Sequence, residues 1–220
     1  MASFRYNIVL NPNLVAAAIV QATKDRLYRT IDQLRMRIRP DLVNYVEKKL
    51  REYPSNTYYS LNFGDLQRDF GFSPGENVAD QVVKTISSSI QLSKLGPTSV
   101  SLGGFRLEIL KEGIQSLLSK DFAAYDSNGN TVDWLRWLLT AGDTIVVADY
   151  QVMKDKGTPL SSSRSGYALM ISPKMSKGFR VDPSHSGTID DNWITRALFS
   201  AQQDMVDKLL IGLEDLLKWA

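Results

Sequence analysis

The chain has 220 residues, of which 43% are hydrophobic, and its 26 basic and 24 acidic residues leave a net charge of +2. This is the composition of a folded globular protein, and it excludes a bulk electrostatic attraction to nucleic acid or to membranes. The absence of cysteine excludes disulfides, thiol nucleophiles and cysteine-ligated metal centres. The longest apolar runs, such as residues 14–20, are far shorter than the roughly 20 residues that span a bilayer, and no basic segment marks a signal peptide. We therefore expect a chain that is neither exported by that route nor inserted into a membrane.

The N-terminal quarter predicts a helical arm over about residues 12–53. Residues 4–10 favour a strand, and Asn11-Pro12-Asn13 then breaks the chain before a helix begins. The apolar residues that recur there at helical spacing, and so form one stripe, are Val20, Leu27, Ile31, Leu34 and Ile38. Pro40 has no backbone N–H, so we expect it to interrupt this helix and a second helix to follow, which gives a kinked or paired arm.

The middle of the chain predicts short helices mixed with extended segments. Aromatic residues among Gly, Pro, Asn and Ser indicate a packed loop over residues 55–75. After it we expect a helix over about 76–92, a strand with one exposed face over 98–110, a short helix at 114–118, a turn at 126–130 and a compact helix over 132–140. Gly142 is the expected C-terminal cap of that last helix.

The C-terminal third predicts a strand pair followed by a long helix. Residues 144–153 are rich in β-branched side chains, and the extended segment 167–172 could pair with them. The connection at about 154–166 is rich in Ser, Gly, Pro and Lys, which predicts a protruding loop. The long amphipathic helix is expected to start at residues 188–191, with an apolar stripe that runs from Ile194 to Leu216.

These elements predict one α+β domain over residues 1–220. We expect a small antiparallel sheet packed by helices, long amphipathic N- and C-terminal helices and a protruding loop. No internal repeat and no linker in the sequence requires a domain boundary.

The sequence gives little support for catalysis. The only histidine, His185, lies between Ser184 and Ser186, but adjacent loop residues do not align a nucleophile, a base and an orienting group. A hard cation would need carboxylates such as Asp182, Asp190 and Asp191, of which the last two more simply occupy the first turn of a helix. There is neither a P-loop nor a dinucleotide-binding glycine motif. We therefore predict no enzyme, no cofactor and no metal, and catalysis at His185 is the enzyme alternative.

The two ends of the chain carry opposite charge. Residues 24–39 contain six basic and two acidic residues, whereas residues 188–220 contain six acidic and three basic ones. The basic segment, including Arg35 and Arg37, has three interpretations: a solvated surface, a pairing with the acidic helix within or between subunits, or a contact with DNA phosphates. The aromatic cluster around Trp134 and Trp137 is predicted to be core.

The C-terminal half resembles virion proteins of the neck and tail-completion kind from tailed bacteriophages. The segments that carry the resemblance read W-L-R-W-L-L-T-A-G-D-T-I at 134–145, S-R-S-G at 163–166, F-R-V-D-P at 179–183, and S-G-T with N-W-I-T-R-A-L within 186–198. The family blocks read approximately L-x-x-G-x-x-I, G-R-S-G, W-x-V-P-x-x-x-x-G-T and N-N-W-I-T-R-A. Ser163, Phe179 and Asp182 depart from that pattern.

The resemblance implies a structural subunit of the head-tail junction, without catalysis or cofactor. Such a subunit forms a homo-oligomeric ring of six or twelve copies that joins the head to the tail around the DNA channel and touches other connector, neck and tail proteins. Its expected location is the virion, after synthesis in the cytoplasm of the bacterial host. A tail terminator that caps the tail tube is the first alternative, and a DNA-binding module at residues 24–39 is the second. We expect Arg164, Trp193 and Arg196 to be structural or interface residues.

Overall fold

The computed structural model describes residues 12–96, 104–127, 130–142, 144, 151–154, 168–171 and 179–219. Helices and strands both occur, which confirms the predicted α+β class. The strands form three separate two-stranded ribbons in the described part of the chain, β1–β2, β3–β4 and β5–β6, and not one sheet. The predicted strand at residues 4–10 and nearly all of the loop at 154–166 lie outside the described residues.

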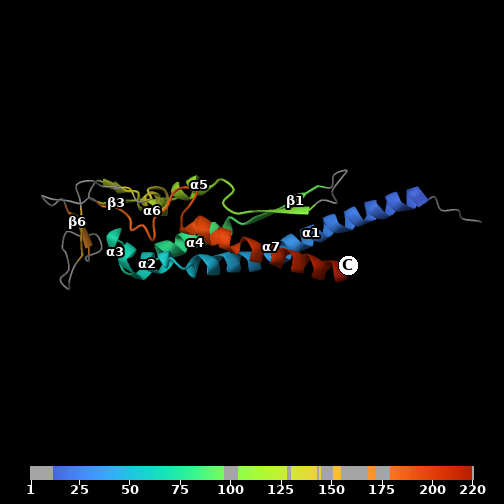
Figure 1. Cartoon of the computed structure of the whole chain (residues 1–220), viewed down its shortest axis with the longest axis horizontal. Helices are drawn as coiled ribbons and strands as arrows, with labels where there is room; N and C mark the ends of the chain where they lie inside the picture. The colour runs from blue at the N-terminus through green and yellow to red at the C-terminus, as the bar shows by residue number, and fades with distance from the viewer. Residues whose placement is uncertain are drawn as a thin grey trace, which may run out of the picture. The chain divides into compact units, whose positions relative to one another are not determined.

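The elements follow one another as Figure 1 shows. In chain order they are α1 (Pro12–Arg51), α2 (Thr57–Phe63), α3 (Asp65–Asp69), α4 (Val78–Ser88), β1 (Gln91–Leu95), β2 (Gly104–Glu108), α5 (Ile114–Leu118), the 3₁₀ helix η1 (Asp121–Ala123), β3 (Tyr125–Ser127), β4 (Asn130–Val132), α6 (Trp134–Thr140), β5 (Gln151–Lys154), β6 (Ala168–Ile171) and α7 (Trp193–Trp219).

The chain divides into two compact units that each combine segments distant in sequence. Unit 1 comprises Met1–Arg39, Gln91–Leu107 and Asp207–Ala220, and unit 2 comprises Pro40–Ile90 and Glu108–Val206. Both long helices, α1 and α7, contribute one part to each unit. The single domain expected over residues 1–220 stays a prediction.

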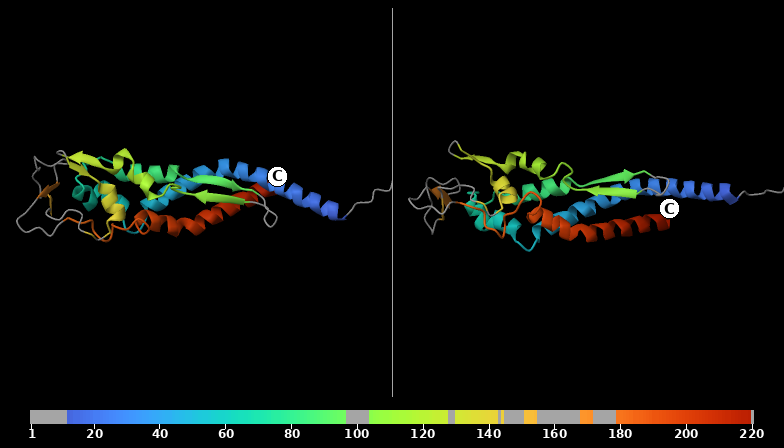
Figure 2. Two further views of the ribbon diagram at one scale, coloured as in Figure 1. Left: turned by 90° about the horizontal axis from the view of Figure 1, so that it is seen from above. Right: turned by 45° about the horizontal axis from the view of Figure 1, so that its top comes forward.

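In unit 1, α7 packs closely on α1, and the β1–β2 ribbon lies beside α1 (Figure 2). Leu34 and Ile38 are buried on α1, and a Cβ added to Gly212 of α7 would come within 3.0 Å of both side chains. Lys94 of β1 forms an ion pair with Asp32 of α1. In the predicted apolar stripe of α1, Ile31, Leu34 and Ile38 are buried, whereas Val20 is 47% exposed.

Helix α1 continues through Pro40 without the predicted interruption. A proline inside a helix removes one hydrogen bond and costs roughly 3 kcal/mol. Pro40 is exposed, so water can reach the carbonyl group that it leaves without a helical donor. The next turns bury Leu42, Val46 and Leu50 completely, and this burial offsets the cost of the proline.

The core of unit 2 is an aromatic cluster around Trp134 of α6. The ring of Trp134 lies 5.8 Å from that of Phe70 and 5.0 Å from that of Phe72, and Phe179 lies 6.3 Å from Phe70. The buried indole N–H of Trp134 donates a 2.6 Å hydrogen bond to the carbonyl oxygen of Phe122. The prediction that Trp134 belongs to the core is confirmed.

Helix α7 starts at Trp193, later than the predicted start at residues 188–191. Asn192 precedes the helix, and its side-chain oxygen accepts hydrogen bonds from the backbone N–H groups of Ile194 (3.0 Å) and Thr195 (3.2 Å). The backbone N–H of Thr188 donates to the carbonyl oxygen of Asp191, which folds residues 188–191 into a turn. Asp190 and Asp191 therefore do not lie in the first turn of a helix, contrary to the prediction.

Other boundaries differ from the predictions because elements of only a few residues are too short to show a repeating pattern of apolar residues. The predicted loop at 55–75 contains α2 and α3, and the predicted helix at 76–92 ends early because β1 begins at Gln91. Helix α5 has the predicted bounds, and Gly142, with φ of 58°, follows α6 as expected. The pairing predicted for the two C-terminal strands is confirmed by the antiparallel ribbon of β5 and β6.

We predict that Gly187→Ala destabilises the protein. A Cβ at this position would lie 2.6 Å from Cα of Asn192 and would also collide with the carbonyl oxygen of Asp191, and neither backbone atom can move without disturbing the start of α7. Overpacking of this kind costs about 1–3 kcal/mol. The loss is measured as a fall in the free energy of unfolding in urea. Gly96→Ala is the matched control, because no atom lies within 4 Å of its added Cβ; an equal loss in both variants would contradict the steric argument.

Candidate interaction surface

His185 is part of the packing of unit 2. It lies in a turn, and its Nδ1 is 3.2 Å from the hydroxyl oxygen of Thr57, which is 2.7 Å from that of Ser55. Thr57 is 1% exposed, so this hydroxyl does not face a substrate. The neighbouring hydroxyl of Ser184 donates to the carboxylate of Asp182 and not to the imidazole. Neither Thr57 nor Ser184 is therefore placed as a nucleophile that His185 could activate for a substrate.

Two of the three carboxylates proposed for a cation accept hydrogen bonds from neighbouring groups. Asp182 accepts hydrogen bonds from the backbone and the hydroxyl of Ser184, which lower its pKa. Asp191 accepts a 2.5 Å hydrogen bond from Nε of Arg196, and this bond lowers the pKa of Asp191. Within the described ranges, no group of three metal-ligating side chains could hold an ion. Nor does any described helix combine the length and apolar character needed to cross a bilayer.

The interface residues expected from the sequence fall in different environments. Trp193 is 1% exposed, so it belongs to the core of its own subunit and not to an exposed surface. Arg196 is held by Asp191 beside the start of α7, which raises the pKa of its guanidinium. Arg35 and Arg37 are exposed on α1. Arg164 lies outside the described residues.

A polar network that the sequence did not predict joins α1, α2 and α4. Arg51 binds Asp80 at 2.8 Å and the hydroxyl of Tyr58 at 2.6 Å, and its guanidinium lies 5.0 Å from the centre of the Tyr58 ring. The hydroxyl of Tyr58 also donates to Asp80, and burial together with this bond raises the pKa of Tyr58. These three side chains are partly buried, and their polar groups form hydrogen bonds and an ion pair with one another. We therefore interpret the network as structural. No spacing in the sequence relates positions 51, 58 and 80.

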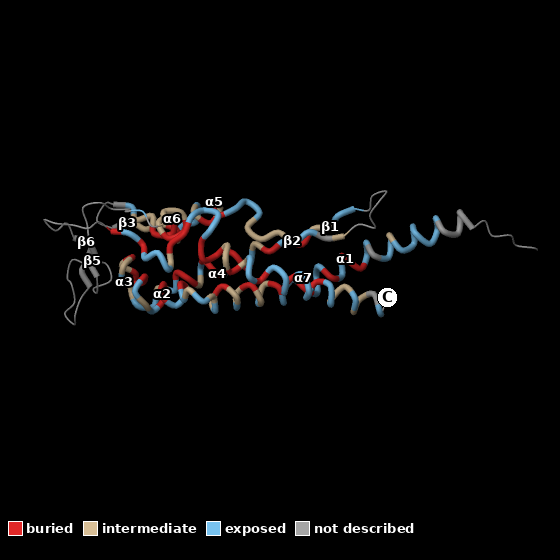
Figure 3. Tube along the Cα trace, in the orientation of Figure 1, coloured by how far each residue is buried: buried red, intermediate tan, exposed pale blue. Residues whose placement is uncertain are grey.

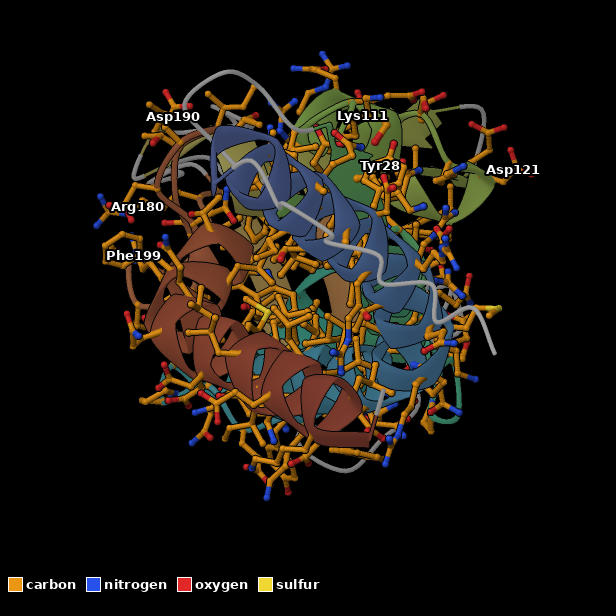
Figure 4. The ribbon with its side chains drawn as sticks, turned by 90° about the vertical axis from the view of Figure 1, so that its right-hand side faces the viewer. Tyr28, Lys111, Asp121, Arg180, Asp190 and Phe199 are labelled. Carbon is orange, nitrogen blue, oxygen red and sulfur yellow. The ribbon has the colours of Figure 1, made fainter. Side chains whose placement is uncertain are left out.

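The surface feature that remains is an apolar stripe along α7. Phe199 is 79% exposed, Val206 39% and Leu210 47%, and Leu213 is half-buried. At about 100° per residue these four side chains fall within about 60° of one another on the helix. Figure 3 shows buried and exposed residues alternating along α7, and Figure 4 shows Phe199 on the outside of that helix. We call these four residues the outward stripe of α7.

The flank of α7 that adjoins the outward stripe is already buried within the chain. Ala201, Met205 and Leu209 are each no more than 4% exposed, as the predicted apolar stripe requires. The outward stripe is therefore a second apolar surface on the same helix. Contiguous apolar surface of this kind marks interaction sites on proteins.

We predict that the folded protein becomes less stable as the pH falls below about 6.5, the ordinary pKa of histidine. Burial lowers the pKa of His185, although Asp182, Asp65 and Asp69 oppose the shift. The unfolded chain then binds the proton more readily than the folded chain, so the free energy of unfolding is complete above that pH and falls towards pH 5.

The measurement is urea unfolding at several pH values between about 5 and 7.5, together with an NMR titration of the imidazole. Since the chain has one histidine, His185→Asn should flatten the pH dependence in this window. The lowered pKa values of Asp182 and Asp191 act only at more acidic pH. An imidazole that titrates above its ordinary pKa would contradict the prediction.

The chain was compared with known proteins at three levels. No protein-family model matches it, and neither a curated protein nor a solved structure does. What its surface does must therefore be argued from its own residues.

Proposed function

We propose that this chain is a structural assembly subunit, namely a ring-forming neck protein that joins the head and tail of a tailed bacteriophage and surrounds the DNA channel. The observation that carries the assembly role is the outward stripe of α7. A helix that buries one apolar flank inside the subunit and exposes another has surface to offer to a second protein.

The composition of this surface fits a protein interface. Phe199 is a large aromatic side chain, and Val206 and Leu210 continue the stripe along the helix. Aromatic and aliphatic anchors surrounded by polar residues are the usual centre of an interface. A solvated helix would not need three large apolar side chains in line.

The head-tail location rests on the resemblance of residues 132–198, and the packing of unit 2 supports it. Trp137 from the first resembling segment lies 5.9 Å from Phe179 in the third. The N–H of Gly142 donates a 2.7 Å hydrogen bond to the carbonyl oxygen of Gly187, which joins the first segment to the last. The first of the resembling segments thus contacts both the third and the last within unit 2.

The same proposal accommodates the exposed arginines of α1. Arg35 and Arg37 could face DNA in the lumen of a ring, where they would add a salt-dependent attraction without sequence specificity. A tail terminator is the alternative within the same structural class. A free DNA-binding module would instead bind duplex DNA as a monomer, with affinity that falls steeply as salt increases.

We predict that Leu210→Asp reduces self-association strongly, whereas Ile211→Asp does not. Both residues are exposed aliphatic side chains on α7, at 47% and 59%, but Ile211 lies about 100° away from Leu210 and outside the outward stripe. A charge buried at an interface without a partner costs several kcal/mol, so Leu210→Asp should raise the dissociation constant at least about a hundredfold. Multi-angle light scattering over a concentration series gives the masses, and equal effects of the two variants would contradict the role of the stripe.

We also predict that phage particles made without this chain contain filled heads and separate tails. Electron microscopy of lysates from a deletion phage, with and without the chain supplied in trans, tests this location directly. Particles that remain joined in its absence would exclude the head-tail junction while leaving self-association to be judged by light scattering.

A further inference from the structure

We propose that the outward stripe of α7 binds the outward basic face of α1 from a second copy of this chain. The inference rests on the proposed assembly role and adds the identity of the two contacting surfaces. It does not depend on where the assembly sits in a particle.

The outward stripe has the spacing of a helix-docking seam. With Gln203 included, its residues follow one another at intervals of four, three, four and three, from Phe199 to Leu213. This alternation keeps side chains on one side of a helix so that they can insert between those of a second helix. The best-fitting occupant is therefore another helix with apolar residues along one face.

The charges beside the stripe select the kind of helix. Asp207 and Glu214 are both exposed, and both lie on the same side of the stripe, one position after Val206 and Leu213. Positions that flank a helix seam choose the partner by charge. An acidic flank favours a basic helix and disfavours a second α7 in an arrangement that brings the two acidic flanks together.

Helix α1 offers such a basic face. Ile19 is 60% exposed and Met36 is 75% exposed, and Arg29 and Arg37 are exposed too. These four side chains fall within about 100° of one another on the helix. The face thus carries arginines, which complement the charges of Asp207 and Glu214, and it has one exposed apolar side chain at each edge, Ile19 and Met36. A surface made only to contact DNA phosphates would not need Ile19 or Met36 in it.

The α1 of the same copy cannot occupy the stripe. In unit 1, α1 already turns the flank with Leu34 and Ile38 towards α7, against Gly212. Its outward face lies on the other side of the helix, since Met36 is about 160° from Leu34 by helical rotation. The contact must therefore come from another copy. Because it joins two different surfaces, it is a head-to-tail contact, which gives a ring when its rotation closes.

The test uses reciprocal charge reversal in the full-length chain. One variant carries Asp207→Lys and Glu214→Lys, and the other carries Arg29→Glu and Arg37→Glu. Each variant alone should lose self-association, with a dissociation constant at least about tenfold higher at low salt, because attraction becomes repulsion. An equimolar mixture should assemble again, because the reversed α7 of one variant then meets the reversed α1 of the other. Sedimentation velocity of each variant, of the mixture and of the wild type gives the readout.

The outcomes separate the possible occupants. Loss in the α7 variant alone would show that α7 meets something other than α1, such as a second α7, and would overturn the proposal. An α1 variant that assembles normally but no longer binds duplex DNA would assign the basic face to DNA and would overturn it too. So would a wild-type chain that stays monomeric over the whole concentration series. Recovery in the mixture also proves that both variants fold; if the lysine variant is unfolded by circular dichroism, Asp207→Asn with Glu214→Gln should give the smaller loss expected from removing the attraction.

This result is independent of the deletion phage. Mutual rescue of the two variants would hold even if the particles remained joined without the chain, and failure of rescue would leave the head-tail location untouched.

Discussion

Helix α7 has more apolar surface than the rest of its own chain covers in the described residues. One flank, with Ala201, Met205 and Leu209, is buried. The outward stripe from Phe199 to Leu213 leaves a second flank in water. An ordinary surface helix needs one apolar stripe about 100° wide, and a second one raises the free energy of the isolated subunit. In the proposed assembly, burial of the outward stripe against a second copy would lower that free energy.

The same packing explains why the two flanks of α1 differ. Gly212 removes the side chain where α7 comes closest to Leu34 and Ile38, so the two helices can approach within van der Waals contact. That close approach uses the apolar flank of α1 and leaves Arg29, Met36 and Arg37 facing outward. A side chain at 212 would have to displace the terminal methyl groups of Leu34 and Ile38.

The sequence predicted those features that depend on periodicity within one element. The buried stripe of α7, the short helix α5 and the pairing of β5 with β6 could be read from spacing and β-branched composition, and Trp134 from its aromatic neighbours. Periodicity did not predict the helix boundaries and interruptions that depend on contacts outside the element itself. Pro40 stays inside α1 because the turns that follow it bury Leu42, Val46 and Leu50. Helix α7 starts later than predicted because residues 188–191 form a turn with backbone hydrogen bonds between Thr188 and Asp191.

The candidate surface was only half predictable for the same reason. Charge bias identified the basic and acidic ends of the chain, and Arg35 and Arg37 proved exposed. Helix α7 has two apolar stripes, and the folded chain buries one of them. The sequence pattern alone does not show which stripe is buried and which stays exposed. The Arg51, Tyr58 and Asp80 network was unpredictable because its members come from three separate helices.

Charge and apolar surface have different tasks in the proposed contact. The apolar side chains of the outward stripe supply most of the free energy of association, because that free energy grows with the apolar area removed from water. It has no directional requirement. They do not by themselves distinguish one apolar helix from another. Asp207 and Glu214 supply that distinction, since a like-charged helix beside them would be repelled and a basic one attracted. A subunit with a net charge of only +2 has little overall repulsion to keep copies apart, so the placement of these few charges decides which surfaces meet.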